Sequence, residues 1–329
     1  MKILVTGGAG YIGSHTVKEI IEKEWQAVVI DNLENSDSQN IYEVLKDSDS
    51  TFHYADMRRK TSYEPVLKGQ TFDAVIHFAA YKNVGESVLE PLKYYENNIT
   101  TLINVLQLIK DQEIPYFVFS SSCSVYGEAD KLPITEDTPL KNAESPYGMT
   151  KQVCEQIIVD SYKNMKGKAV LLRYFNPAGA HPDNSIGESP KGGANSLVSR
   201  IVSFAKGNLA EFEVYGNDYS TRDGSCIRDF IHVADLANAH VTVLENMEKQ
   251  EKNLEVYNVA TGKGTTVFEM INAFKEECKD IDVKIGPRRE GDIIAAYSDN
   301  TKIENKLNWK PKYTINDIVR TAWAWVNKN

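Results

Sequence analysis

Tyr147 and Lys151 are the pair of side chains in this sequence best suited to proton transfer. They lie in SPYGMTK, residues 145–151, where a spacing of four places both on one face of a predicted helix. A phenol has a pKa of ~10, and lowering it by about 3 units requires roughly 4 kcal/mol in favour of the phenolate. An ammonium group about 4 Å away, at an effective dielectric near 20, supplies roughly that amount. The spacing therefore predicts a tyrosine base, and the competing interpretation is a packed tyrosine beside a solvated lysine.

Two other polar segments follow candidate strands and favour the catalytic interpretation. They are HFAAYKNVGES, residues 77–87, and SSSCSVYG, residues 120–127. Ligands of open parallel sheets bind beyond the carboxyl ends of the strands, so we expect both segments to face one cavity. Ser145 can cap the helix that carries the Tyr–Lys pair, and Pro146 suits its first turn.

The N-terminal stretch KILVTGGAGYIG, residues 2–13, is typical of a nucleotide-binding turn. It begins with a short β-branched strand and places Gly7, Gly10 and Gly13 at every third position, before an amphipathic run over 12–21. Glycines let the backbone approach a pyrophosphate, and the helix N-terminus offers N–H donors and a positive dipole end. The stretch predicts a dinucleotide site.

The next candidate strand indicates which dinucleotide is bound. Residues 25–30 are apolar and end at Asp31, 18 residues after Gly13. A carboxylate there can accept both ribose hydroxyls and would repel a 2′-phosphate. No Arg or Lys lies between Asp31 and Asn40, so the sequence predicts NAD rather than NADP.

Alternating strands and helices predict an α/β fold with a doubly wound parallel Rossmann sheet. The candidate strands are 27–30, 52–54, 74–78, 117–120 and 170–174, and the candidate helices include 94–110, 267–278 and 315–326. The alternation breaks in a stretch rich in Gly, Pro and Asn over 176–195. We therefore expect an NAD-binding domain over 1–175 and a smaller C-terminal α/β substrate domain over 176–329, with some of its segments returning to pack on the first.

Composition restricts the class of protein. The chain has 329 residues, 42% hydrophobic and 25% charged, which predicts one large or two ordinary domains. It has no run of 18 apolar residues and no signal peptide, so we expect a cytoplasmic protein without a membrane partner. Four widely spaced cysteines and six histidines lack the spacing of a disulfide framework or a metal site, so we expect no metal. A net charge of −9 argues against nucleic acid as a partner.

Taken together, the motifs resemble the extended short-chain dehydrogenase/reductase family, and within it the sugar-nucleotide 4-epimerases. The resemblance spans essentially the whole chain, and its most specific pieces are TGGAGYIGSH, DNLENS, HFAAYKNVGES, FSSSCSVYG, SPYGMTK, LLRYFNPAGAHP, DGSCIRDFIHV and PRREGD. It implies an isomerase that inverts C4 of UDP-hexoses, from UDP-galactose to UDP-glucose, through a transient 4-keto sugar. It also implies NAD as a bound cofactor that is neither consumed nor produced, a UDP-sugar as substrate, and a homodimer.

The resemblance assigns roles to individual residues. The implied catalytic residues are Ser122, Tyr147 and Lys151. These three would also contact NAD, together with Gly7, Gly10, Tyr11, Ile12, Gly13, Asp31, Asn32, Leu33, Asn35, Ser36, Asp56, Met57, Phe78, Ala79, Lys82, Asn97 and Phe175. The UDP-sugar would be held by Lys82, Ser122, Tyr147, Asn176, Ser196, Leu197, Tyr215, Arg228, Arg289, Asp292 and Ala296, with the two arginines on the diphosphate.

Two residues depart from the pattern of this family on the sugar side. Ser196 stands where an Asn is usual, and Ala296 stands where members restricted to plain hexoses have a Tyr. Both changes remove volume, so we expect that UDP-GlcNAc and UDP-GalNAc are also substrates. The competing interpretation is that Tyr297 shifts by one position and fills the space.

The same motifs bear on other activities of related enzymes. Sugar-nucleotide 4,6-dehydratases need acidic residues where this chain has Cys123 and Ser124, and neither of these protonates a leaving hydroxyl usefully. Alternatives that stay open are a 4-epimerase of a UDP-pentose or UDP-uronic acid, a net dehydrogenase of a free sugar or steroid, and a non-catalytic NAD-sensing regulator. Regulators of this fold tend to lose the Tyr or Lys, and both are present here.

Overall fold

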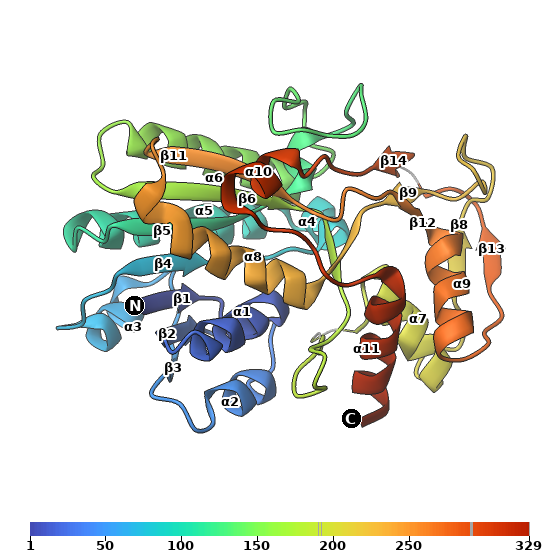
Figure 1. The fold of residues 1–329 in the computed structure, drawn as a ribbon, viewed down its shortest axis with the longest axis horizontal. Helices are drawn as coiled ribbons and strands as arrows, with labels where there is room; N and C mark the ends of the chain where they lie inside the picture. Colours follow the sequence, from blue (N-terminus) through green and yellow to red (C-terminus); the bar gives the residue numbers. More distant parts are fainter. Residues whose placement is uncertain (190, 192, 290–291, 329) are drawn as a thin grey trace.

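A computed structural model of the chain describes residues 1–189, 191, 193–289 and 292–328 (Figure 1). Its main sheet is seven-stranded, in the order β11-β6-β5-β4-β1-β2-β3, and all of its neighbouring strands run parallel. The strands of this sheet are β1 (Lys2–Thr6), β2 (Gln26–Asp31), β3 (Thr51–Tyr54), β4 (Ala74–His77), β5 (Tyr116–Ser122), β6 (Lys168–Tyr174) and β11 (Leu254–Val259). The predicted Rossmann sheet is confirmed.

Alternation of side chains along the strands creates two apolar faces. In β1, Ile3 and Val5 join one buried cluster and Leu4 joins another, because successive side chains of a strand point to opposite faces. Helices α1 (Tyr11–Glu22), α2 (Gln39–Leu45), α8 (Val233–Asn246) and α10 (Thr301–Leu307) contribute to the first cluster. Helices α3 (Lys60–Leu67), α5 (Pro91–Asp111) and α6 (Pro146–Tyr162) contribute to the second. The result is a three-layer α/β/α arrangement.

A second lobe, at the right of Figure 1, is built mainly from later parts of the chain. Helices α7 (Leu197–Lys206), α9 (Val267–Glu277) and α11 (Ile315–Lys328) share a third apolar cluster, and the predicted helices at 267–278 and 315–326 are thereby confirmed. The lobe is completed by small sheets of β7 (Asn176–Ala178) with β10 (Phe230–His232), of β8 (Glu213–Tyr215) with β13 (Lys284–Gly286), and of β9 (Ile227–Arg228) with β12 (Thr265–Thr266) and β14 (Ala295–Ala296). Shorter elements are α4 (Val84–Leu89), η1 (Cys123–Tyr126) and η2 (Met247–Lys249).

The chain crosses between the two lobes more than once. Strand β11 pairs with β6 at the edge of the main sheet, and α8 and α10 pack on the same sheet although they follow residue 175. A division into domains at 175/176 stays a prediction. Within the described residues, no helix combines the length and the apolar character that crossing a membrane requires.

Candidate active site

A cavity of about 840 Å³ lies between the carboxyl ends of the main sheet and the second lobe. Its walls include the loops after β1, β2, β3, β4 and β5, the start of α6, and parts of α7, β8 and β9. Every site residue predicted from the sequence lines this cavity except Leu33 and Ala296. The structure thus brings together residues that are up to about 285 positions apart in the chain, from Gly7 to Asp292.

Leu33 and Ala296 lie just outside the cavity for different reasons. Leu33 has a φ of 54°, and its side chain packs against the apolar cluster beneath the loop. Ala296 pairs with Arg228 in the sheet of β9, and its methyl group packs against the cluster that contains Phe175. The ring of Tyr297 lies against Gly264.

The glycine turn after β1 fits a pyrophosphate. Gly7 has a φ of 73°, and a Cβ there would stand 2.5 Å from the backbone nitrogen of Ala79. A Cβ at Gly13 would stand 2.4 Å from the carbonyl oxygen of Gly7. Gly10 is the N-cap of α1 and provides no side-chain cap, so the first N–H groups of the helix are left for a ligand.

Asp31 is held at the mouth of this turn by three hydrogen bonds. Its carboxylate accepts from the N–H of Ala9 at 3.1 Å, the N–H of Leu33 at 2.8 Å and the hydroxyl of Ser36 at 3.2 Å. Burial raises the pKa of Asp31, and these hydrogen bonds act in the opposite direction. The carboxylate is therefore positioned where the predicted NAD ribose would need an acceptor, and the residues of the turn fit the ADP half of NAD.

The predicted catalytic side chains meet at the start of α6. Ser145 caps the helix, accepting the N–H of Gly148 at 3.2 Å, and Tyr147 lies in the first turn. Ser122, at the end of β5, hydrogen-bonds with the Tyr147 side chain. Lys151 donates from Nζ to the carbonyl oxygen of Ser120 at 2.7 Å, and its Nζ lies 6.0 Å from the centre of the Tyr147 ring.

Burial shifts the pKa values of Tyr147 and Lys151 in opposite directions. Burial raises the pKa of Tyr147 to about 12, and the hydrogen bond with Ser122 lowers it only in part. Burial likewise lowers the pKa of Lys151 to about 8. That Lys151, together with the positive charge of a nicotinamide ring, makes Tyr147 a base near neutral pH stays a prediction.

Two arginines converge on one carboxylate at the far wall of the cavity. The Arg289 guanidinium donates to Asp292 Oδ1 at 2.7 Å and lies 5.6 Å from the centre of the Tyr215 ring. Arg228 lies 3.6 Å from the same oxygen and donates to the carbonyl of Ile293 at 2.7 Å. In the motif at 287–292, residues 290 and 291 lie outside the described residues. The wall offers the paired cations expected for a diphosphate.

The predicted substrate residue Ser196 also has a structural role. Its hydroxyl accepts the N–H of Ser199 at 3.2 Å as the N-cap of α7, and it donates to Glu188 at 3.1 Å. Glu188 lines the cavity, and sequence reasoning missed it because the stretch around it has no periodicity. Tyr81 and Thr101 line the cavity as well; Tyr81 lies within the segment 77–87 that the sequence placed at the site.

Comparisons with known proteins agree with this geometry. Residues 4–322 match the family model described as GDP-mannose 4,6 dehydratase. A UDP-glucose 4-epimerase of Cyamopsis tetragonoloba is 44% identical, over 99% of this chain and 95% of its own.

Solved structures are similar over the full length. The UDP-glucose 4-epimerase from Bifidobacterium longum, in complex with NAD⁺ and UDP, superposes with a TM-score of 0.95 at 40% identity, covering 100% of this chain and 99% of its own. The UDP-Glc/GlcNAc 4-epimerase from Campylobacter jejuni gives a TM-score of 0.86 at 36% identity, with 100% of this chain and 99% of its own covered.

Proposed function

Because the chain belongs to the UDP-glucose 4-epimerase family of extended short-chain dehydrogenases/reductases, we propose that it interconverts UDP-galactose and UDP-glucose, with NAD as its bound cofactor and Ser122, Tyr147 and Lys151 as its catalytic residues. One observation carries the assignment of residues. A buried Tyr–Ser pair, a glycine turn beside a held carboxylate, and two arginines at the far wall all line a single cavity.

Proton transfer falls to the residues at the start of α6. When bound, NAD would supply the chemistry of taking up the C4 hydride of the sugar and giving it back. Tyr147 takes the proton of the 4-hydroxyl, and Ser122 hydrogen-bonds the same oxygen and relays the proton. Lys151 would hold the nicotinamide ribose and add a positive charge near the phenolate. Burial raises the pKa of Tyr147, and the positive charges of Lys151 and of bound NAD⁺ would act in the opposite direction.

The arrangement of the far wall explains how one hydride can return to the other face. Arg228 and Arg289 hold the diphosphate, whereas the sugar is held loosely enough to rotate about its bond to the diphosphate. Binding energy concentrated on the remote UDP keeps the 4-keto sugar in the cavity during this rotation.

Small side chains on the predicted sugar side favour a second set of substrates. Ala296 ends in a methyl group, and Tyr297 is packed against Gly264. A relative of the same fold is described as acting on both UDP-Glc and UDP-GlcNAc. We therefore include UDP-GlcNAc and UDP-GalNAc among the proposed substrates.

Further features of the chain support a proposal for its assembly and its cellular location. Leu89 and Leu92, at the junction of α4 and α5, are each 81% exposed, and Val84 and Val88 add to this apolar surface. We propose that it is covered in a homodimer. All four cysteines are free thiols, which fits the reducing cytoplasm that we propose as the location.

One assay tests the proposed reaction against its alternatives. The purified protein is offered UDP-galactose, UDP-GalNAc, a UDP-pentose and a UDP-uronic acid, with and without added NAD, and the epimers are separated. Conversion of UDP-galactose without net formation of NADH supports the proposal. Accumulation of NADH would indicate a dehydrogenase, and bound NAD without turnover of any UDP-sugar would indicate a regulator.

A further inference from the structure

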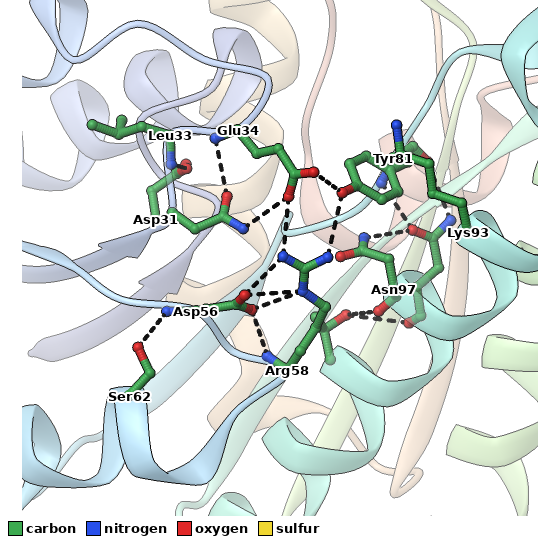
Figure 2. Close-up of polar contacts among 12 residues, drawn as sticks. Asp31, Leu33, Glu34, Asp56, Arg58, Ser62, Tyr81, Lys93 and Asn97 are labelled. Atoms are coloured by element: carbon green, nitrogen blue, oxygen red, sulfur yellow. Dashed lines mark hydrogen bonds and ion pairs between the residues drawn. The ribbon is translucent and has the colours of Figure 1, made fainter.

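Three loops are joined by polar contacts at the adenosine end of the cavity (Figure 2). The Tyr81 hydroxyl donates to Oε1 of Glu34, and the Arg58 guanidinium donates to Oε2 of Glu34 at 3.1 Å. The same guanidinium donates to the Tyr81 hydroxyl at 3.4 Å. Glu34, Arg58 and Tyr81 follow β2, β3 and β4 respectively, and we call these three residues the clasp.

The order of strands determines what the clasp crosses. In the main sheet β1 lies between β4 and β2, so the loops after β4 and β2 contact each other across the carboxyl end of β1. This end of β1 carries the glycine turn from Gly7 to Gly13 that fits the pyrophosphate. A contact between Glu34 and Tyr81 therefore spans the mouth of the dinucleotide site.

Two members of the clasp are held firmly by other groups. The ring of Tyr81 is 3% exposed and lies 5.5 Å from the ring of Tyr94, with the Lys93 ammonium 4.6 Å from its centre. The backbone N–H of Tyr81 donates to Asn98 Oδ1 at 2.8 Å. These contacts fix one side of the closure independently of Glu34.

Arg58 is fixed in a similar way by a neighbouring carboxylate. Its Nε lies 3.0 Å from both oxygens of Asp56, and its NH2 group lies 2.7 Å from Oδ2. Burial raises the pKa of Asp56, but the hydrogen bonds from Arg58 outweigh it and hold the pKa below its usual value. The guanidinium is thus engaged by two carboxylates and is oriented toward Glu34.

Glu34 is the side of the clasp that can open. Its side chain is 40% exposed and lies on the loop between β2 and α2. Glu34, Asp56 and Tyr81 line the cavity. Removal of the Glu34 carboxylate would free this loop from both Tyr81 and Arg58 while leaving their other contacts in place.

We propose that the clasp closes the adenosine end of the cavity and determines how slowly NAD leaves the protein. This inference rests on the proposed function, because a cofactor that is regenerated in every cycle has to stay bound between cycles. NAD dissociates only after the contacts of Glu34 with Tyr81 and Arg58 break. Glu34, Arg58 and Tyr81 are positioning residues, since they act on the loops that enclose the cofactor.

The test measures the rate of NAD loss in conservative variants. Tyr81→Phe removes one hydroxyl and keeps the ring, and Glu34→Gln removes the charge and keeps the size. NAD-loaded protein is mixed with excess ADP-ribose, and the NAD remaining on the protein is measured over time by chromatography of the extracted nucleotide. We expect each variant to lose NAD roughly tenfold faster than the wild type. A change of this size corresponds to the loss of one hydrogen bond to a charged group. Activity lost on gel filtration should return when NAD is added.

Matched controls separate the clasp from general destabilisation. Tyr42, on α2, is 60% exposed and lies outside the cavity. Tyr42→Phe removes its hydroxyl, and this variant should keep the wild-type rate of NAD loss. The double variant should lose NAD no faster than the more affected single variant, because the two groups share one contact. If Tyr81→Phe fails to fold, Glu34→Gln at its exposed position decides the result.

The outcomes distinguish this inference from the proposed function. Wild-type rates of NAD loss in both single variants would overturn the clasp and leave the epimerase assignment intact. Faster NAD loss in the variants, combined with no conversion of any UDP-sugar by the wild type, would support the clasp and overturn the proposed function.

Discussion

At the scale of single residues, the Tyr147 hydroxyl is the group on which the chemistry depends. Tyr147→Phe should lower epimerase kcat by about 10²- to 10⁴-fold, the usual contribution of a general base. NAD binding should persist, because the ring keeps its packing with Tyr81 and Tyr94. Turnover of UDP-galactose and the NAD content of the purified variant are the two measurements. Tyr162→Phe is the control. Tyr162 lies on the same helix, and its buried hydroxyl has no hydrogen-bond partner among the described residues. An equal loss of kcat in both variants would contradict the role of Tyr147.

Residue 296 tests the proposed range of substrates. Ala296→Tyr adds a large ring beside the cluster that contains Phe175, and this ring should occupy the space available to an acetamido group. We expect turnover of UDP-GalNAc to be abolished and that of UDP-galactose to be spared. The ratio of kcat/KM for the two sugars is the measurement, and Ala296→Ser serves as a small-residue control. A parallel decline for both sugars would count against the open pocket.

Prediction of the site from the sequence succeeded where residues directly follow a strand. Gly7, Asp31 and Ser122 were placed in the cavity because the carboxyl ends of parallel strands share one edge of the sheet. Glu188 and the contacts of Arg58 were not foreseen, because they depend on how loops from different strands meet. Burial also raises the pKa of Tyr147, and this effect cannot be derived from the spacing of two residues.

At the scale of elements, the N-cap of α6 links stability to catalysis. Ser145→Ala removes the acceptor for the N–H of Gly148 and should lower the free energy of unfolding by about 1 kcal/mol. The first turn of α6 also positions Tyr147, so kcat should fall as well. Thr266→Ala is the control, because it removes the cap of α9, whose Oγ1 accepts the N–H of Glu269 at 3.0 Å and also donates to Asp223. We expect at least as large a loss of stability with unchanged kcat, measured by urea unfolding and steady-state kinetics. A loss of kcat in both variants would show only general destabilisation.

Elements with strong local patterns were predicted closely, whereas the connection between the lobes was not. The helix predicted at 94–110 lies within α5, and the strand predicted at 170–174 lies within β6. Strand β11 was not predicted, although its alternating sequence LEVYNV suits an edge strand. Its pairing with β6 joins residues 85 positions apart, and such long-range pairing leaves no local signal.

At the scale of the whole molecule, buried histidines should make the fold sensitive to acid. Burial lowers the pKa of His15 and His77 to about 3 and that of His232 and His240 to about 4. In the unfolded chain a histidine has a pKa of ~6.5. Between these values the unfolded chain binds protons that the folded protein does not, so the free energy of unfolding falls as the pH falls.

The pH window follows from these values. The contribution of the histidines is fully present above about pH 6.5. It is lost progressively toward about pH 4 for His232 and His240 and toward about pH 3 for His15 and His77, with a slope of up to about 1.4 kcal/mol per pH unit for each residue. Urea unfolding at several pH values from 7.5 to 4.5 measures this slope. In His240→Gln the dependence of the free energy of unfolding on pH should be shallower, because one buried titrating ring is removed. Asn246→Gln, on the same helix α8, is the control and should keep the wild-type slope. A slope that His240→Gln leaves unchanged would show that the acid sensitivity arises elsewhere in the molecule.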